Sequence, residues 1–198
     1  MTLKNAFDEF MFQKELAGLS PASLSDYRSY IAIMLNHVGE STDLESVTYE
    51  LVSNYIMALL HRPLSKATIS TYVRNTRIFL RWVHAEYGLS FDPVKIKVPK
   101  APKKNVHVLS SAEIQYLLDS AKCSVPWLTA RNKAIIALML DSGLRQNEVC
   151  TLVKKGLDFD RGALQVTGKG CKDRLVPLGY IFKILITITE REILVSTI

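Results

Sequence analysis

The sequence contains little cysteine, and its cysteines are not arranged to cross-link the chain or to bind a metal. Only Cys123, Cys150 and Cys171 occur, an odd number with no C-x-x-C pair. This pattern fits neither a disulfide framework nor a zinc knuckle. We therefore expect reduced thiols without a structural task, and neither a metal nor any other cofactor.

Long apolar runs are also absent. No stretch of about 20 uncharged apolar residues occurs, so the sequence offers no candidate membrane span. The first residues lead directly into Asp8 and Glu9 and lack the apolar region of a secretory signal. These absences predict a cytoplasmic protein.

Acidic residues are scarce in one segment. Between Arg62 and Lys104 the sequence has ten basic residues but only two acidic ones, Glu86 and Asp92. The segment's excess of +8 exceeds the net charge of +6 of the whole chain. Such a basic block favours a polyanionic partner, and without a membrane anchor that partner is expected to be nucleic acid.

Residues 1–88 are expected to form a helical domain. Apolar residues recur at helical spacing in four segments, and residues that cap or end helices separate them. The expected caps and ends are Gly18, Ser20, Pro21, Gly39, Thr48, Pro63, Ser65 and Gly88. A chain of 198 residues leaves room for a second domain of about 100 residues.

The fourth of these helices is expected to carry a basic face on the side opposite its apolar residues. Five polar residues fall within about 80° of arc on a helical wheel. This basic face consists of Lys66, Ser70, Arg74, Arg77 and Arg81. Because no acid interrupts it before Glu86, we expect the face to contact DNA, although an ordinary solvated face is the alternative.

Residues 89–108 are expected to form a basic linker. They contain three prolines, five lysines and no helical period. The lysines could follow DNA phosphates, or they could serve only the solubility of a spacer.

From residue 109 onward the sequence predicts a mixed α+β unit. A short strand at 106–109 is followed by a helix to Ala121, which Ser110 and Glu113 begin as a capping box. Helices at 130–142 and 146–152 follow, with Gly143 between them. Strands are expected at 163–167 and 173–177, with Phe159 in a possible third.

Two motifs in this unit carry a resemblance. Gly143, Leu144 and Arg145 are followed by Glu148 and Leu152, a G-L-R-x-x-E-x-x-x-L pattern. Residues 168–178 read G-K-G-x-K-x-R-x-V-P-L. In this order and at this spacing they resemble the first arginine motif and the β-hairpin of the tyrosine recombinases, the phage integrase family.

The resemblance implies a mainly α fold. A four-helix, SAM-like core-binding domain (1–88) and a linker (89–108) would precede a partial α+β catalytic domain (109–198) with a small antiparallel sheet. In this family a tyrosine attacks a DNA phosphodiester, while arginines bind the non-bridging oxygens.

The same resemblance implies roles for individual residues. Arg145 would be the first catalytic arginine, supported by Glu148. Lys169 would protonate the leaving 5′-oxygen, with Lys172 a weaker alternative. Lys172 and Arg174 would otherwise contact DNA phosphates.

The sequence also departs from the family. A second arginine in an H-x-x-R motif and a late nucleophilic tyrosine are missing, because every histidine lies at or before His107. Tyr180 lies too close to the hairpin to be the nucleophile, and residues 179–198 match nothing specific. We therefore expect the front part of a recombinase that binds duplex DNA and other recombinase protomers but does not cleave DNA by itself.

Two other hypotheses stay open. A non-catalytic regulator that competes with a full-length integrase for DNA would use the same residues. A helical protein-interaction module could use the basic face to meet an acidic partner, but it would not need the hairpin.

Overall fold

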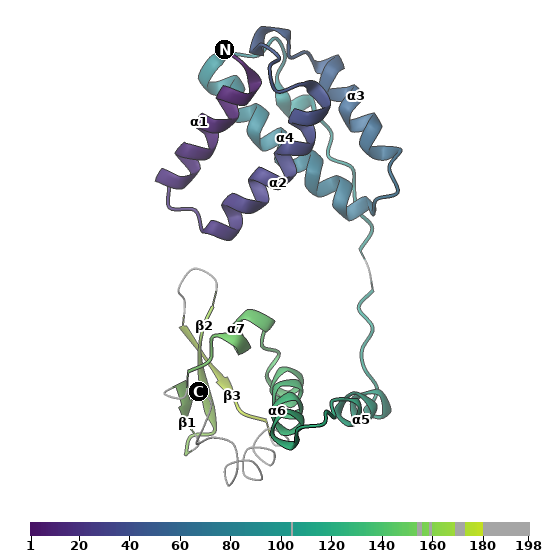
Figure 1. The fold of residues 1–198 in the computed structure, drawn as a ribbon, viewed down its shortest axis with the longest axis vertical. Helices are drawn as coiled ribbons and strands as arrows, with labels where there is room; N and C mark the ends of the chain where they lie inside the picture. The colour runs from purple at the N-terminus through teal and green to yellow at the C-terminus, as the bar shows by residue number, and fades with distance from the viewer. Residues whose placement is uncertain (104, 154–155, 159, 169–172, 180–198) are drawn as a thin grey trace. The chain divides into compact units, whose positions relative to one another are not determined.

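The computed structural model describes residues 1–103, 105–153, 156–158, 160–168 and 173–179. The chain divides into two compact units, Met1–Asn105 and Val106–Ile198 (Figure 1). The described part is mainly helical and includes one small antiparallel sheet. No helix in these ranges combines the length and apolar character of a membrane span.

The first unit consists of four α-helices and two short 3-10 turns. The helices are α1 (Leu3–Leu16), α2 (Pro21–Val38), α3 (Tyr49–Leu60) and α4 (Lys66–Tyr87), and the 3-10 turns are η1 (Leu44–Ser46) and η2 (Pro93–Lys95). Ser20, Thr48 and Ser65 cap α2, α3 and α4 through their hydroxyls. The four predicted helices and these caps are confirmed.

Helix α4 forms the centre of this unit. It contacts α1, α2 and α3 (Figure 1) and also η2. Phe79 on α4 packs edge-to-face on Phe7 and Phe10 of α1, with ring centroids 5.7 and 5.4 Å apart. The indole N–H of Trp82 donates to the side-chain oxygen of Gln13 at 2.9 Å, which ties the same two helices together.

Part of the segment expected to be a linker packs on this helical unit. Leu89, Pro93 and Ile96 are buried, and Leu89 and Ile96 belong to the core cluster of the first unit. The Arg77 guanidinium donates to the backbone oxygen of Ile96 at 3.3 Å. Only from about residue 100 does the backbone lie exposed and without regular structure.

The second unit contains α5 (Ser111–Ser120), α6 (Pro126–Ser142) and α7 (Gln146–Cys150). Ser110 and Glu113 form the predicted capping box of α5. Helix α6 begins four residues earlier than expected, with Pro126 in its first turn, where a helix needs no N–H donor. No strand forms at 106–109, where Val106 and Val108 are 87% and 84% exposed and no strand of the described residues pairs with them.

The described part of this unit also contains a three-stranded antiparallel sheet of order β1-β2-β3, with β1 (Leu157–Asp158), β2 (Ala163–Thr167) and β3 (Asp173–Pro177). The predicted bounds of β2 and β3 are confirmed, and Phe159 lies outside the described residues. The sheet, α6 and the segment before α7 share one apolar core, which includes Leu138, Leu144, Leu164, Val166, Val176 and Leu178.

Candidate functional site

Arg145 follows a sharp change of chain direction. Gly143 ends α6 in the left-handed conformation (φ 63°), and its N–H donates to the Met139 oxygen at 3.0 Å. The next side chain, Leu144, is buried in the core of the second unit. Arg145 is the N-cap residue of α7. Its backbone is extended, and its side chain is 77% exposed.

Glu148 fixes this arginine at two points. The backbone N–H of Arg145 donates to Oε2 of Glu148 at 2.8 Å, and its Nη1 donates to Oε1 at 3.1 Å. The Glu148 side chain is only 7% exposed. Arg145 is thus held through its backbone N–H and one guanidinium nitrogen, while 77% of its side chain stays exposed.

A second arginine shares the same carboxylate. Arg174 of β3 donates from Nη1 to Oε1 and from Nη2 to Oε2 of Glu148, both at 2.8 Å. These bonds to Arg174, followed by the Arg145 backbone bond, lower the pKa of Glu148 to about 2 against the opposing effect of burial. The same pairing raises the pKa of Arg174.

The hairpin that carries Arg174 is closed by side-chain bonds next to its turn. Thr167 Oγ1 donates to Asp173 Oδ1 at 2.7 Å, and Gln165 Nε2 donates to Asp173 Oδ2 at 3.2 Å. Lys169 and Lys172, expected as the general acid and a phosphate contact, lie outside the described residues.

The basic face of α4 is narrower than the sequence predicted. Lys66, Arg74 and Arg81 are exposed, and Arg77 is half-buried against Ile96. Ser70 is only 5% exposed, so its assignment to a contact surface was wrong. Because α4 packs against three helices and η2, its buried side is wider than a single apolar stripe.

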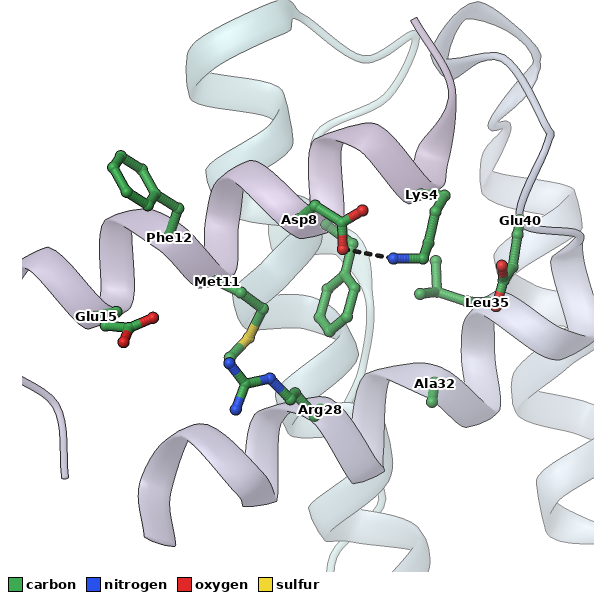
Figure 2. Close-up of a pocket in the computed structure, with 10 residues that line it drawn as sticks. Lys4, Asp8, Met11, Phe12, Glu15, Arg28, Ala32, Leu35 and Glu40 are labelled. Atoms are coloured by element: carbon green, nitrogen blue, oxygen red, sulfur yellow. Dashed lines mark hydrogen bonds and ion pairs between the residues drawn. The ribbon is translucent and has the colours of Figure 1, made fainter. Parts of the chain in front are cut away.

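A cleft of about 440 Å³ between α1 and α2 contains none of these residues. Figure 2 shows Met11 of α1 and Arg28 and Leu35 of α2 at this cleft. Charges of both signs line it, including the ion pair of Lys4 with Asp8. It therefore shows neither a basic surface for phosphates nor a set of catalytic side chains.

The described residues also contain no group of three or more histidine, cysteine or acidic side chains that could bind a metal. Cys123 and Cys150 are free and exposed, and Cys171 lies outside the described residues.

Comparison with known proteins identifies the kind of fold that carries the arginines. Residues 107–195 match the Phage integrase family. A tyrosine recombinase XerD of Oceanobacillus iheyensis is 33% identical over 177 residues, covering 87% of this chain and 59% of its own length. Residues 107–195 thus match the phage integrase family, and most of the chain is similar to tyrosine recombinases. The predicted resemblance is confirmed.

Other recombinases match over similar lengths. A XerD of Halalkalibacterium halodurans is 28% identical, covering 91% of this chain and 62% of its own length. The chain thus spans about three fifths of the length of these curated recombinases.

Solved structures show the same recombinase fold. A lambda integrase, crystallised as a dimer bound to a COC′ core site, matches 97% of this chain and 70% of its own chain, with a TM-score of 0.80 and 17% identity. The integrase of transposon Tn1549, in complex with circular intermediate DNA, matches with a TM-score of 0.72 and 16% identity. The predicted fold class is confirmed.

The interaction between Arg174 and Glu148 was missed by sequence reasoning, although a signal for it existed. Arg174 stands two residues before buried Val176 in a strand, and residues two apart share a face. An arginine on the core-facing side of a sheet is expected to pair with an acid, and Glu148 of the arginine motif was a candidate.

Proposed function

We propose that this chain binds duplex DNA, with α4 on the phosphate backbone and Arg145 on an individual phosphate. The arrangement of Arg145 carries the proposal, because an exposed guanidinium fixed by a nearly buried carboxylate can donate two bonds to non-bridging phosphate oxygens. Glu148 is fully occupied by its arginines, so it does not compete as a free anion at the surface.

The first unit has exposed cations of its own on α4. Arg74 and Arg81 are both exposed, seven residues and about two turns apart on one helix. DNA complexes of lambda integrase and Tn1549 integrase, which share the fold, support DNA as the partner. The dimer and the tetramer of lambda integrase support binding beside other protomers.

DNA affinity measured against salt concentration tests the proposal. The double variant Arg74→Gln/Arg81→Gln should lower the slope of log K against log salt by about 1.8, or about 0.9 for each lost phosphate contact. Arg28→Gln combined with Lys122→Gln removes the same charge from other exposed positions and should change the slope little. No binding to any duplex at low salt would refute the proposal.

We further propose that these 198 residues do not cleave DNA by themselves. The sequence has no histidine after His107, and so no H-x-x-R motif downstream of Arg145. Suicide substrates, which trap a covalent intermediate, should yield no DNA–protein adduct. An adduct that disappears in Tyr180→Phe would show that this proposal is wrong.

A further inference from the structure

Arg174 lies on the core-facing side of the hairpin. In the register of β2 and β3 it stands directly opposite Val166, which is 2% exposed, and two residues before Val176, which is 8% exposed. Directly opposed residues share one face of an antiparallel sheet. The base of the Arg174 side chain therefore lies among apolar neighbours, and only 39% of the side chain is exposed.

The end of this side chain is directed at Glu148, 26 positions earlier in the sequence. Two parallel N–H bonds of 2.8 Å join the guanidinium fork to both carboxylate oxygens. Such bidentate pairs fix orientation as well as distance, because both groups are planar. The bond links β3 to α7, two elements that are otherwise joined through the apolar core.

The two arginines use Glu148 in different ways. Arg145 gives it one guanidinium bond of 3.1 Å and stays 77% exposed, whereas Arg174 gives it two shorter bonds and is half as exposed. Without Arg174, the carboxylate would lose both bonds of this guanidinium fork and could rotate away from Arg145.

We propose that Arg174 is a positioning residue for Arg145 and not itself a phosphate contact. It fixes the Glu148 carboxylate, and the carboxylate fixes the Arg145 guanidinium in the direction of the phosphate. This inference rests on the proposed role of Arg145 as a phosphate ligand. It replaces the phosphate contact that the sequence suggested for Arg174.

A first experiment tests the positioning without DNA. NMR of the arginine Nε–H groups should show that the Arg145 side chain becomes more mobile in Arg174→Lys, which retains the charge but cannot form the fork. Arg161→Lys, a change at an arginine that is 85% exposed in the same unit, should leave Arg145 unchanged. Unchanged order at Arg145 in Arg174→Lys would overturn the proposal.

The unmodified chain provides a second measurement that does not depend on a variant folding. On titration with a short DNA duplex, the Nε–H resonance of Arg145 should shift first, with little change at Arg174. A shift of Arg174 equal to or larger than that of Arg145 would assign it to the phosphate and overturn the proposal.

A double-mutant cycle measures the coupling on DNA. Arg174→Lys and Arg174→Gln should weaken binding alike, each by about as much as Arg145→Gln, and adding either to Arg145→Gln should cause no further loss. Wild-type affinity in Arg174→Lys together with additive losses for Arg174→Gln would identify a direct phosphate contact instead. If the unmodified chain binds no duplex, the proposed function fails, and the side-chain order of Arg145 without DNA still decides the positioning.

Discussion

Glu148 is the residue on which the geometry of the site depends. Its two oxygens accept four hydrogen bonds, three from guanidinium groups and one from the backbone. The carboxylate has little exposed surface, so water cannot replace a lost partner easily. Substituting any of the three residues therefore changes the environment of the other two.

The depressed pKa of Glu148 predicts a pH-dependent contribution to stability. The folded-state pKa is about 2, whereas a glutamate of an unfolded chain titrates near about 4.3. The ionised carboxylate therefore stabilises the fold fully above about pH 5, and this contribution is lost as the pH falls toward about 2. Urea unfolding at several pH values should show that the stability difference between wild type and Glu148→Gln shrinks over this window. A difference that is constant with pH would contradict the assignment.

At the scale of elements, an aromatic cluster holds α1 and α4 together. Phe10 has no exposed surface and lies within 5.5 Å of the ring centroids of Tyr27, Phe79 and Trp82. Phe10→Ala should lower the free energy of unfolding by about 3–5 kcal/mol, because it removes buried area and leaves a cavity.

Phe12 is the matched control for this prediction. It lies two residues further along α1 and is 60% exposed. Phe12→Ala should change the free energy of unfolding by no more than about 0.5 kcal/mol, measured by the same urea titration. Equal losses for the two variants would show that the cluster is not the core of the unit.

The turn between α6 and α7 depends on a glycine backbone. Gly143 has φ 63°, and a Cβ atom placed on it would meet nothing within 4 Å. Gly143→Ala should therefore cost about 1–2 kcal/mol through backbone strain alone. Gly143→Asn should cost less, because asparagine tolerates the left-handed region. Thermal unfolding of the two variants would separate strain from steric contact, since a clash would penalise Asn more than Ala.

Local signals explain which elements could be predicted from the sequence. Ser20, Thr48, Ser65 and Ser110 each accept a backbone hydrogen bond at a helix start, and such caps are visible in the sequence. The alternation at 163–167 and 173–177 likewise needs no knowledge of distant residues.

The sequence analysis failed where the local structure depends on residues that are distant in the sequence. A strand at 106–109 requires a neighbouring strand, and the described residues provide none for it. Ser70 is buried because α4 packs against several elements at once. The interaction of Arg174 with Glu148 was not predicted, because the two residues lie 26 positions apart in the sequence. Helical wheels and strand periods show faces, but they do not show what covers them.

At the scale of the whole molecule, charge is unevenly distributed along the chain. Residues 1–105 contain thirteen basic and ten acidic residues, and residues 106–198 contain twelve and nine, so both units have a net charge of +3. Within the first unit, however, residues 1–61 carry a net charge of −5, whereas the segment from Arg62 to Lys104 carries +8. An attraction to DNA is therefore expected to depend on α4 and the residues after it.

Limited proteolysis tests whether the first unit folds and binds DNA without the second unit. Lys100 and Lys103 are exposed in backbone without regular structure, whereas the core cluster of the first unit ends at Ile96. Brief digestion with trypsin should therefore cut first after one of these lysines and release a resistant fragment with α1–α4. Because the fragment retains Arg74 and Arg81, it should bind duplex DNA with a smaller salt dependence than the whole chain. Early cleavage within α4, identified by mass spectrometry, would contradict an independently folded first unit.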